Sequence, residues 1–275
     1  MITVNGYPVK ITRFPDNTFK FDTDEVENVI SEDGKTVFHW RFESMEELFT
    51  LKGLIKHFKL KDLKSDLVLY MPYLPNARMD KTHDYYEGFM LEFFGDELNE
   101  IGFSKVIVED VHSTVAYDLI NNLEEIPYAT ASRIFASILA SKATVLCFPD
   151  KGARDRYTKL LSDVSQFGVT EKIVYGEKVR NQVTGKIISY QIVDELGVSD
   201  GASVLIVDDI CSGGYTFKLA GDALKARGAK ELSLYVTHME DTAIDRGTIF
   251  EDGLFKQVFT SKSLVTKSHE KLVKL

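Results

Sequence analysis

The chain alternates short apolar runs with longer stretches in which apolar residues recur every three or four positions. Apolar runs bounded by turn residues are typical of buried β-strands, and the longer period is typical of amphipathic helices. The pattern predicts strands at 67–73, 106–108, 144–148, 173–175, 187–192, 204–207 and 232–236. It predicts helices from 44, about 84–101, 131–140, from about 153, and from 216 to about 227. Strands that alternate with helices indicate an α/β fold with mainly parallel sheets flanked by helices.

Two of these helices carry boundary signals. Ser44 is followed three residues later by Glu47, which is the spacing of a capping box at a helix start. The apolar face that follows comprises Leu48, Leu51, Ile55 and Phe58. Gly102 comes directly after the helix predicted at 84–101, and glycine commonly ends helices in the left-handed conformation.

Polar residues gather just after four of the predicted strands, at 76–83, 109–114, 149–154 and 208–216. Ligands of open parallel sheets bind beyond the carboxyl ends of the strands, so we expect these clusters to converge. The order of strands and helices repeats on either side of residues 126–130. We therefore expect two α/β domains, 1–127 and 128–275, with the last residues able to pack back on the first domain.

Composition narrows the class of protein. The chain has 275 residues, 44% of them hydrophobic and 27% charged, close to averages for soluble globular proteins. No apolar run approaches the roughly 20 residues of a membrane span, and we see no signal peptide. A net charge of −9 argues against nucleic-acid or anionic-membrane partners, but not against phosphorylated small molecules. Cys147 and Cys211 lie in or beside predicted strands, which favours buried thiols, and we expect a cytoplasmic protein.

Residues 204–216 place a buried strand, an acidic pair, a glycine turn and a helix start in direct succession. Asp208 and Asp209 are expected to end the strand, and their carboxylates can hold ribose hydroxyls or a magnesium ion. Glycines allow backbone N–H groups to approach phosphate oxygens, and a helix N-terminus adds partial positive charge. The segment is neither a Walker loop nor a dinucleotide fingerprint. It predicts a site for ribose and phosphate; the alternative is an ordinary strand-to-helix turn with a solvated acidic pair.

Six segments resemble, in the same order, motifs of the ribose-phosphate pyrophosphokinase (phosphoribosyl pyrophosphate synthetase) family. They are 72–81, 110–113, 148–152, 178–180, 208–216 and 235–238. The resemblance spans about residues 12–240. It implies two tandem domains of the type I phosphoribosyltransferase fold, the first on the ATP side and the second binding ribose 5-phosphate. It also implies a reaction in which Mg-ATP donates its diphosphoryl group to the C1 hydroxyl of ribose 5-phosphate, giving phosphoribosyl pyrophosphate and AMP.

The resemblance further implies roles for particular residues. The ATP-binding residues would be Arg78, Asp80, Lys81, Phe14 and Asp16. The ribose 5-phosphate-binding residues would be Asp208, Asp209, Ser212, Gly213, Gly214 and Thr216. Catalysis would rest on Lys178, Arg180 and His112, and His112 and Asp150 would meet Mg²⁺, the expected cofactor. A homodimer or larger homo-oligomer is expected, because the loop of Phe14 reaches a neighbouring subunit in the family.

Phosphoryl transfer depends mainly on positioning and on stabilising charge, which two cations on a mobile loop can supply. Residues 176–186 are polar and are expected to form such a lid; an exposed hairpin is the alternative. The sequence leaves open whether Arg154 and Arg156 contact a ligand or only form the solvated face of a helix.

Four positions depart from the family pattern: Thr18, Met79, Ser212 and Tyr215. The glycine turn is spelled more like that of transferases that consume phosphoribosyl pyrophosphate. Such a transferase and a non-catalytic regulatory homologue of the synthetase therefore remain as alternatives.

Overall fold

The computed structural model of the chain describes residues 1–30, 34–60, 65–82, 87–164, 172–180, 187–194, 197–246 and 248–275, and for residues 179, 180, 187, 188 and 252 only the backbone. The chain divides into two compact units, Met1–Ile126 (unit 1) and Pro127–Leu275 (unit 2). None of the helices in the described part of the chain is long and apolar enough to cross a membrane.

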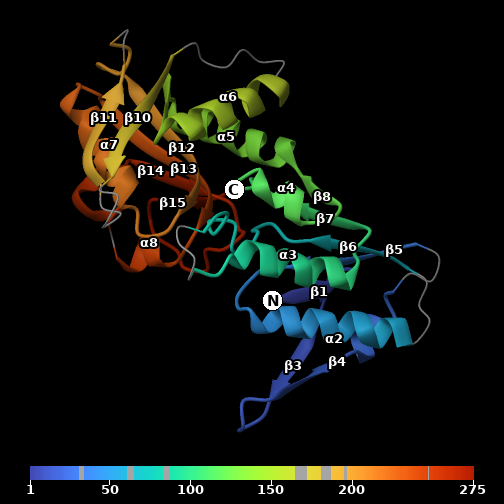
Figure 1. Cartoon of the computed structure of the whole chain (residues 1–275). Coiled ribbons are helices and arrows are strands. Elements are labelled where there is room, and N and C mark those ends of the chain that lie inside the picture. The colour runs from blue at the N-terminus through green and yellow to red at the C-terminus, as the bar shows by residue number, and fades with distance from the viewer. Residues whose placement is uncertain are drawn as a thin grey trace. The chain divides into compact units, whose positions relative to one another are not determined.

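Unit 1 is built around a mixed sheet in the order β2-β1-β5-β6-β7-β8 (Figure 1). Strands β5 to β8 are parallel, and β1 and β2 extend the sheet in antiparallel fashion. A separate two-stranded antiparallel sheet pairs β3 with β4. The elements are β1 Ile2–Val4, β2 Tyr7–Pro8, β3 Lys10–Arg13, β4 Phe19–Asp22, α1 Asp24–Glu27, β5 Lys35–Trp40, α2 Glu46–Leu60, β6 Asp66–Tyr70, α3 Met90–Ile101, β7 Lys105–Val108, α4 Val115–Leu119 and β8 Leu123–Glu125.

Unit 2 is built around a larger sheet in the order β11-β10-β9-β12-β13-β14-β15. Every neighbouring pair is parallel except β10 and β11. The elements are α5 Pro127–Ser141, β9 Val145–Phe148, α6 Lys151–Val164, β10 Ile173–Arg180, β11 Ile187–Val193, β12 Ser203–Cys211, α7 Tyr215–Ala226, β13 Glu231–Met239, α8 Thr242–Asp245, the 3₁₀ helix η1 Glu251–Gly253, β14 Gln257–Thr260 and β15 Leu272–Lys274. The predicted α/β class with mainly parallel sheets is confirmed.

The sheet of unit 2 is covered on both faces, because successive residues of a strand point to opposite sides. In β12, Val204 and Ile206 pack into one core with the apolar stripe of α7, while Leu205 and Val207 pack into another with α5 and α6. Figure 1 shows α7 and the α5–α6 pair on opposite sides of this sheet. A strand buried on both faces reads as a continuous apolar run, which is why 204–207 was recognisable from the sequence.

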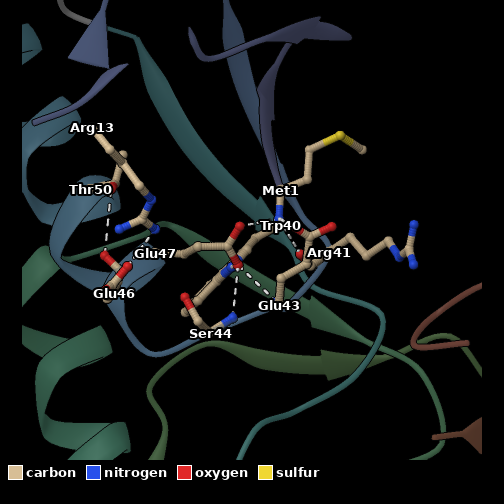
Figure 2. Close-up of polar contacts among 9 residues, drawn as sticks. All are labelled: Met1, Arg13, Trp40, Arg41, Glu43, Ser44, Glu46, Glu47 and Thr50. Carbon is tan, nitrogen blue, oxygen red and sulfur yellow. Dashed lines mark hydrogen bonds and ion pairs between the residues drawn. The ribbon is translucent and has the colours of Figure 1, made fainter. Parts of the chain in front are cut away.

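The start of α2 confirms the Glu47 half of the predicted capping box (Figure 2). The Glu47 carboxylate accepts hydrogen bonds from the backbone N–H groups of Ser44 at 3.5 Å and Glu43 at 2.8 Å. It also accepts one from the indole N–H of Trp40 at 2.8 Å and pairs with the Met1 ammonium group. The helix itself begins two residues after Ser44, at Glu46.

Several predicted boundaries were wrong. Strand β12 does not end before the acidic pair but continues to Cys211, because its pairing with β13 runs on to Cys211 and Met239. Helix α5 begins at Pro127, four residues earlier than predicted, and proline suits the first position of a helix. The predicted helix start near Asp84 lies outside the described residues, and α3 begins at Met90.

Candidate active site

An acidic pair within the last part of β12 meets an arginine of α6 in unit 2. The Arg156 guanidinium nitrogen lies 3.1 Å from Asp209 Oδ1 and 3.7 Å from Asp208 Oδ1. Arg156 comes from α6, where its guanidinium also stacks 4.7 Å from the ring centre of Tyr157. Asp209 is only 4% exposed, and the side chain of Asp208 is 20% exposed. The structure therefore places two carboxylates and one cation in a poorly hydrated corner.

The position of Asp209 affects the ionisation of Asp208. Burial raises the pKa of Asp208 well above its usual range, and the neighbouring Asp209 carboxylate raises it further. Arg156 acts in the opposite direction and lowers the pKa of Asp208. A cation bound here by the pair would act in the same direction as Arg156, because it favours the ionised carboxylates.

Asp150 and Lys178 form an ion pair beside this corner. Asp150 follows β9, Lys178 lies on the adjacent strand β10, and Lys178 Nζ is 2.7 Å from Asp150 Oδ2. The other carboxylate oxygen accepts a hydrogen bond from the Ala153 N–H at 2.9 Å, at the start of α6. Burial alone would raise the pKa of Asp150, but Lys178, the Ala153 N–H and the more distant Arg156 outweigh it and hold the pKa below its usual value.

The glycine turn after β12 leads directly into α7. Gly214 is the N-cap of that helix with a φ of +77°, and as a glycine it has no side chain with which to cap the first N–H groups. A methyl group at Gly214 would lie 2.5 Å from Ile249 Cγ2, so both the backbone and the packing require glycine. Ser212, Gly213 and Thr216 are partly exposed around this turn. The turn thus presents backbone donors at a helix N-terminus, an arrangement that suits an anion.

The segment predicted as a lid is partly strand. Residues 173–180 form β10, which pairs with β11, so Lys178 is held in a sheet and not on a free loop. The side chain of Arg180 and residues 181–186 lie outside the described part of the structure.

In unit 1, the structure brings together the loops that carry Arg78 and His112. Strands β6 and β7 are parallel neighbours, and the Glu109 N–H donates to the Pro72 carbonyl at 3.0 Å just beyond them. The side chain of Glu109, which is 3% exposed, accepts a hydrogen bond from the Tyr70 hydroxyl. Arg78 and His112 are both exposed. Asp80 and Lys81 follow on the same loop as Arg78.

The loop of His112 is further fastened by Glu125 at the end of β8. Glu125 Oε1 accepts a hydrogen bond from the Val111 N–H at 3.2 Å, and Oε2 accepts one from the Tyr117 hydroxyl at 2.7 Å. Asp110, between Glu109 and Val111, has a positive φ of 47° and is 3% exposed. This left-handed backbone conformation makes the chain turn sharply just after β7.

Phe14 and Asp16 lie elsewhere in unit 1, at the tip of the β3–β4 hairpin. Phe14 is 44% exposed. Asp16 Oδ1 accepts hydrogen bonds from the hydroxyl of Thr18 at 2.7 Å and its N–H at 3.0 Å, and these lower the pKa of Asp16. Thr18, which departs from the family pattern, thus makes a local turn with Asp16.

Two residues of the unit 2 site were missed or left open by the sequence analysis. The buried face of α6 comprises Ala153, Tyr157 and Leu161. Arg156 lies next to Tyr157 at the border of this face, and that position in the sequence could have indicated a partly buried arginine. Tyr190 on β11 donates its hydroxyl to the Pro149 carbonyl at 3.2 Å, and no sequence pattern pointed to it. Arg154, also on α6, pairs with Asp155 and covers the ring of Tyr175 on β10.

Within the described residues, no three or more His, Cys, Asp or Glu side chains are close enough to hold a metal ion by themselves. Mg²⁺ is often bound by only one or two carboxylates together with substrate phosphates, so this arrangement is compatible with a metal that arrives with ATP. Cys147 and Cys211 are buried and form no disulfide, as predicted.

Comparison with known families identifies this fold. The family described as phosphoribosyl transferase domain matches residues 120–268. The chain belongs to this family. The match covers nearly all of unit 2, including the acidic pair, the glycine turn and the β10–β11 hairpin.

Curated relatives extend the similarity into unit 1. The chain is 25% identical over 237 residues to chloroplastic ribose-phosphate pyrophosphokinase 2 of Oryza sativa, a match that covers 83% of this chain and 54% of that protein. It is 26% identical over 196 residues to the ribose-phosphate pyrophosphokinase of Saccharolobus solfataricus, covering 70% of this chain and 62% of that protein. The chain therefore spans between about half and two thirds of the length of these relatives.

A solved structure supports the fold of the whole chain. Phosphoribosylpyrophosphate synthetase from Mycobacterium smegmatis superposes with a TM-score of 0.75 at 18% identity, over 98% of this chain and 85% of that one. The predicted resemblance to ribose-phosphate pyrophosphokinases is thus confirmed, while the roles of the individual site residues stay predictions.

Proposed function

We propose that the chain is a ribose-phosphate diphosphokinase. In this reaction the C1 hydroxyl oxygen of ribose 5-phosphate attacks the β-phosphorus of ATP. The bond between that phosphorus and the oxygen bridging it to the α-phosphorus breaks, AMP leaves with the bridging oxygen, and the hydroxyl proton is released. Phosphoribosyl pyrophosphate is the other product.

One observation carries the proposal: the similarity to ribose-phosphate pyrophosphokinases covers 83% of the chain and so reaches well beyond the matched domain at 120–268. A transferase that consumes phosphoribosyl pyrophosphate needs only one α/β unit of this kind. The paired loops of Arg78 and His112 in unit 1 would have no use in such an enzyme.

In unit 2, ribose 5-phosphate would bind through two neighbouring groups. Asp208 and Asp209 would accept hydrogen bonds from the ribose hydroxyls. The turn from Ser212 to Thr216 would hold the 5-phosphate with backbone N–H groups and hydroxyls at the N-terminus of α7. Because the turn carries no acidic side chain, it adds no repulsion against the phosphate.

Lys178 would act on the diphosphoryl group during transfer. In this structure its ammonium group is neutralised by Asp150 at 2.7 Å. The Asp150 carboxylate would hold Mg²⁺, which would supply positive charge there. The Lys178 ammonium group would then be available to contact the phosphates. Arg180 would supply a second positive charge.

ATP would bind to unit 1 through Arg78, Asp80 and Lys81, with His112 near its magnesium ion and Phe14 and Asp16 near its base. An arginine fork suits phosphate oxygens because it offers paired N–H donors in one plane. Mg²⁺ would supply charge neutralisation on the phosphates. The enzyme would be cytoplasmic and a homodimer or larger homo-oligomer.

The test supplies ATP, ribose 5-phosphate and Mg²⁺ and measures AMP and phosphoribosyl pyrophosphate by chromatography. Equal amounts of the two products would support the proposal. Turnover only with added nucleobase and phosphoribosyl pyrophosphate would show a consuming transferase, the alternative that the transferase-like glycines Gly213 and Gly214 favour. No product formation with any of several divalent metals and phosphate concentrations would favour a regulatory homologue.

Replacement of Lys178 gives a sharper prediction for the same assay. Lys178→Ala should lower kcat by about 100-fold or more, since a charge that acts in the transition state is lost. The KM for ATP should change little. Lys159→Ala, on the exposed face of α6, is the matched control and should leave kcat unchanged. Near-normal turnover of Lys178→Ala would remove Lys178 from the catalytic residues.

A further inference from the structure

Tyr190 on β11 shares a face of the β10–β11 hairpin with Lys178. It lies directly opposite Lys178, and Gly176 is opposite Ile192, two positions further along. Residues directly opposite in an antiparallel pair share a face of the sheet, as do residues two apart in one strand. Gly176, Lys178 and Tyr190 therefore lie on one face.

Gly176 lets the Tyr190 side chain cross that face. A methyl group at Gly176 would lie 2.0 Å from the Tyr190 hydroxyl oxygen and 2.6 Å from the Pro149 carbonyl oxygen. The Tyr190 hydroxyl thus lies over the glycine and donates a hydrogen bond to the Pro149 carbonyl, 3.2 Å away. Glycine within a strand often marks such a close approach.

Pro149 immediately precedes Asp150, so this hydrogen bond acts on the same short loop as the ion pair. Lys178 Nζ holds Asp150 Oδ2 at 2.7 Å, and the Ala153 N–H holds Oδ1 at 2.9 Å. Tyr190 instead binds the backbone, at the carbonyl of the peptide group that joins Pro149 to Asp150. The loop is therefore attached at both its backbone and its side chain, and the backbone attachment comes from the strand partner of Lys178.

We propose that Tyr190 is a positioning residue, whose hydroxyl fastens the Pro149–Asp150 loop to the β10–β11 hairpin and thereby fixes Asp150 and Lys178 relative to each other before the diphosphoryl group is transferred. This inference rests on the proposed function.

The hydroxyl is suited to a fixed structural bond and not to proton transfer. Burial, followed by the nearby Cys147, Asp150 and Asp208, raises the pKa of Tyr190 far above its usual value. The hydroxyl therefore keeps its proton and stays a hydrogen-bond donor at all pH values at which the enzyme would work.

The experiment compares Tyr190→Phe with the wild type, because phenylalanine keeps the ring and removes only the hydroxyl. We expect kcat to fall by about tenfold, since small misplacements of reacting groups are costly. The KM for ATP should stay within about twofold and the melting temperature nearly unchanged, because the ring still fills its place. Tyr175→Phe, on the same sheet, is the control and should leave kcat unchanged.

A second measurement does not depend on activity. Brief acetylation followed by mass spectrometry reports how often Lys178 leaves Asp150, with the exposed Lys159 as an internal reference. The labelling ratio of Lys178 to Lys159 should rise severalfold in Tyr190→Phe, and also in Gly176→Ala, in which the methyl group displaces the hydroxyl.

The two measurements separate two kinds of failure. An unchanged labelling ratio in both folded variants would overturn the positioning role, whatever the enzyme does. A raised ratio in a protein that makes no phosphoribosyl pyrophosphate would support the attachment and reject the proposed reaction. A fall in melting temperature with normal kcat and an unchanged ratio would show that Tyr190 only stabilises the fold.

Discussion

Arg156 shows how much a single side chain depends on its surroundings. Its sequence context, among Lys151, Arg154 and Lys159, is that of a solvated helix face. In the structure its guanidinium lies 3.1 Å from the buried Asp209 carboxylate and over the ring of Tyr157. A partly buried cation beside two carboxylates offsets the desolvation that their ionised forms would suffer.

Replacing Arg156 should therefore cost more as the pH rises. The pKa of Asp208 is higher in the folded protein than in the unfolded chain. At pH values above the unfolded pKa, folding therefore loses stability because the buried carboxylate is harder to ionise, and Arg156 reduces that loss. We expect Arg156→Gln to lower stability by about 2 kcal/mol at about pH 8 and by clearly less at about pH 5, where protonation relieves the unpaired charge. Thermal unfolding at both pH values measures this difference.

The control is Arg154→Gln, two residues away on the same helix, where the arginine pairs with Asp155 and stacks on Tyr175. Its partner Asp155 is exposed, and exposed ion pairs contribute little. Arg154→Gln should therefore change stability by the same amount at both pH values. A pH-independent loss for Arg156→Gln would mean that its packing on Tyr157, and not its charge, matters.

At the scale of elements, helix starts and strand ends set the positions of the chemistry. The N-cap Gly214 with its positive φ starts α7 where β12 ends, and the Glu47 carboxylate starts α2. Glu47 is 8% exposed and is surrounded by N–H donors (Figure 2). Removing an acceptor from buried donors costs their full desolvation.

Glu47→Ala should accordingly lower the free energy of unfolding by about 2–3 kcal/mol, because the indole N–H of Trp40 and the backbone N–H of Glu43 would lose their acceptor. Urea unfolding followed by Trp40 fluorescence gives the value. Glu46→Ala is the matched control: Glu46 forms an ion pair with the exposed Arg13, and its loss should cost under about 0.5 kcal/mol. Equal losses in the two variants would contradict the role of Glu47.

At the scale of the whole molecule, the chain is two units, each with its own hydrophobic core. The core of unit 1 is drawn from residues 2–123, and the two cores of unit 2 from residues 131–275. A unit of about 150 residues with its own core can fold alone.

We expect residues 127–275, expressed alone, to unfold cooperatively and to form no AMP from ATP, because the loops of Arg78 and His112 are missing. Circular dichroism during urea unfolding and the AMP assay test the two statements separately. A sloping, non-cooperative transition would show that unit 2 depends on unit 1. AMP formation by unit 2 alone would remove unit 1 from ATP binding.

The sequence was informative wherever local physics decides. The strand at 204–207 was recognisable because it is apolar on both faces, and Gly102 ends α3 in the left-handed conformation, as predicted. The order of the polar motifs was enough to indicate the family. The acidic pair was misplaced at a strand end because hydrogen bonding to β13, which no local signal reports, extends β12 through it.

The sequence by itself determined the α/β class, the buried cysteines, the glycine turn and the residues that could carry the chemistry, because these depend on periodicity, backbone freedom and residue type. Only the tertiary structure decided that Arg156 meets the acidic pair, that Lys178 neutralises Asp150 and that Tyr190 crosses Gly176 to reach Pro149. These are contacts between segments up to 53 residues apart, from Arg156 to Asp209. They arise because parallel strands bring distant loops to one edge of a sheet.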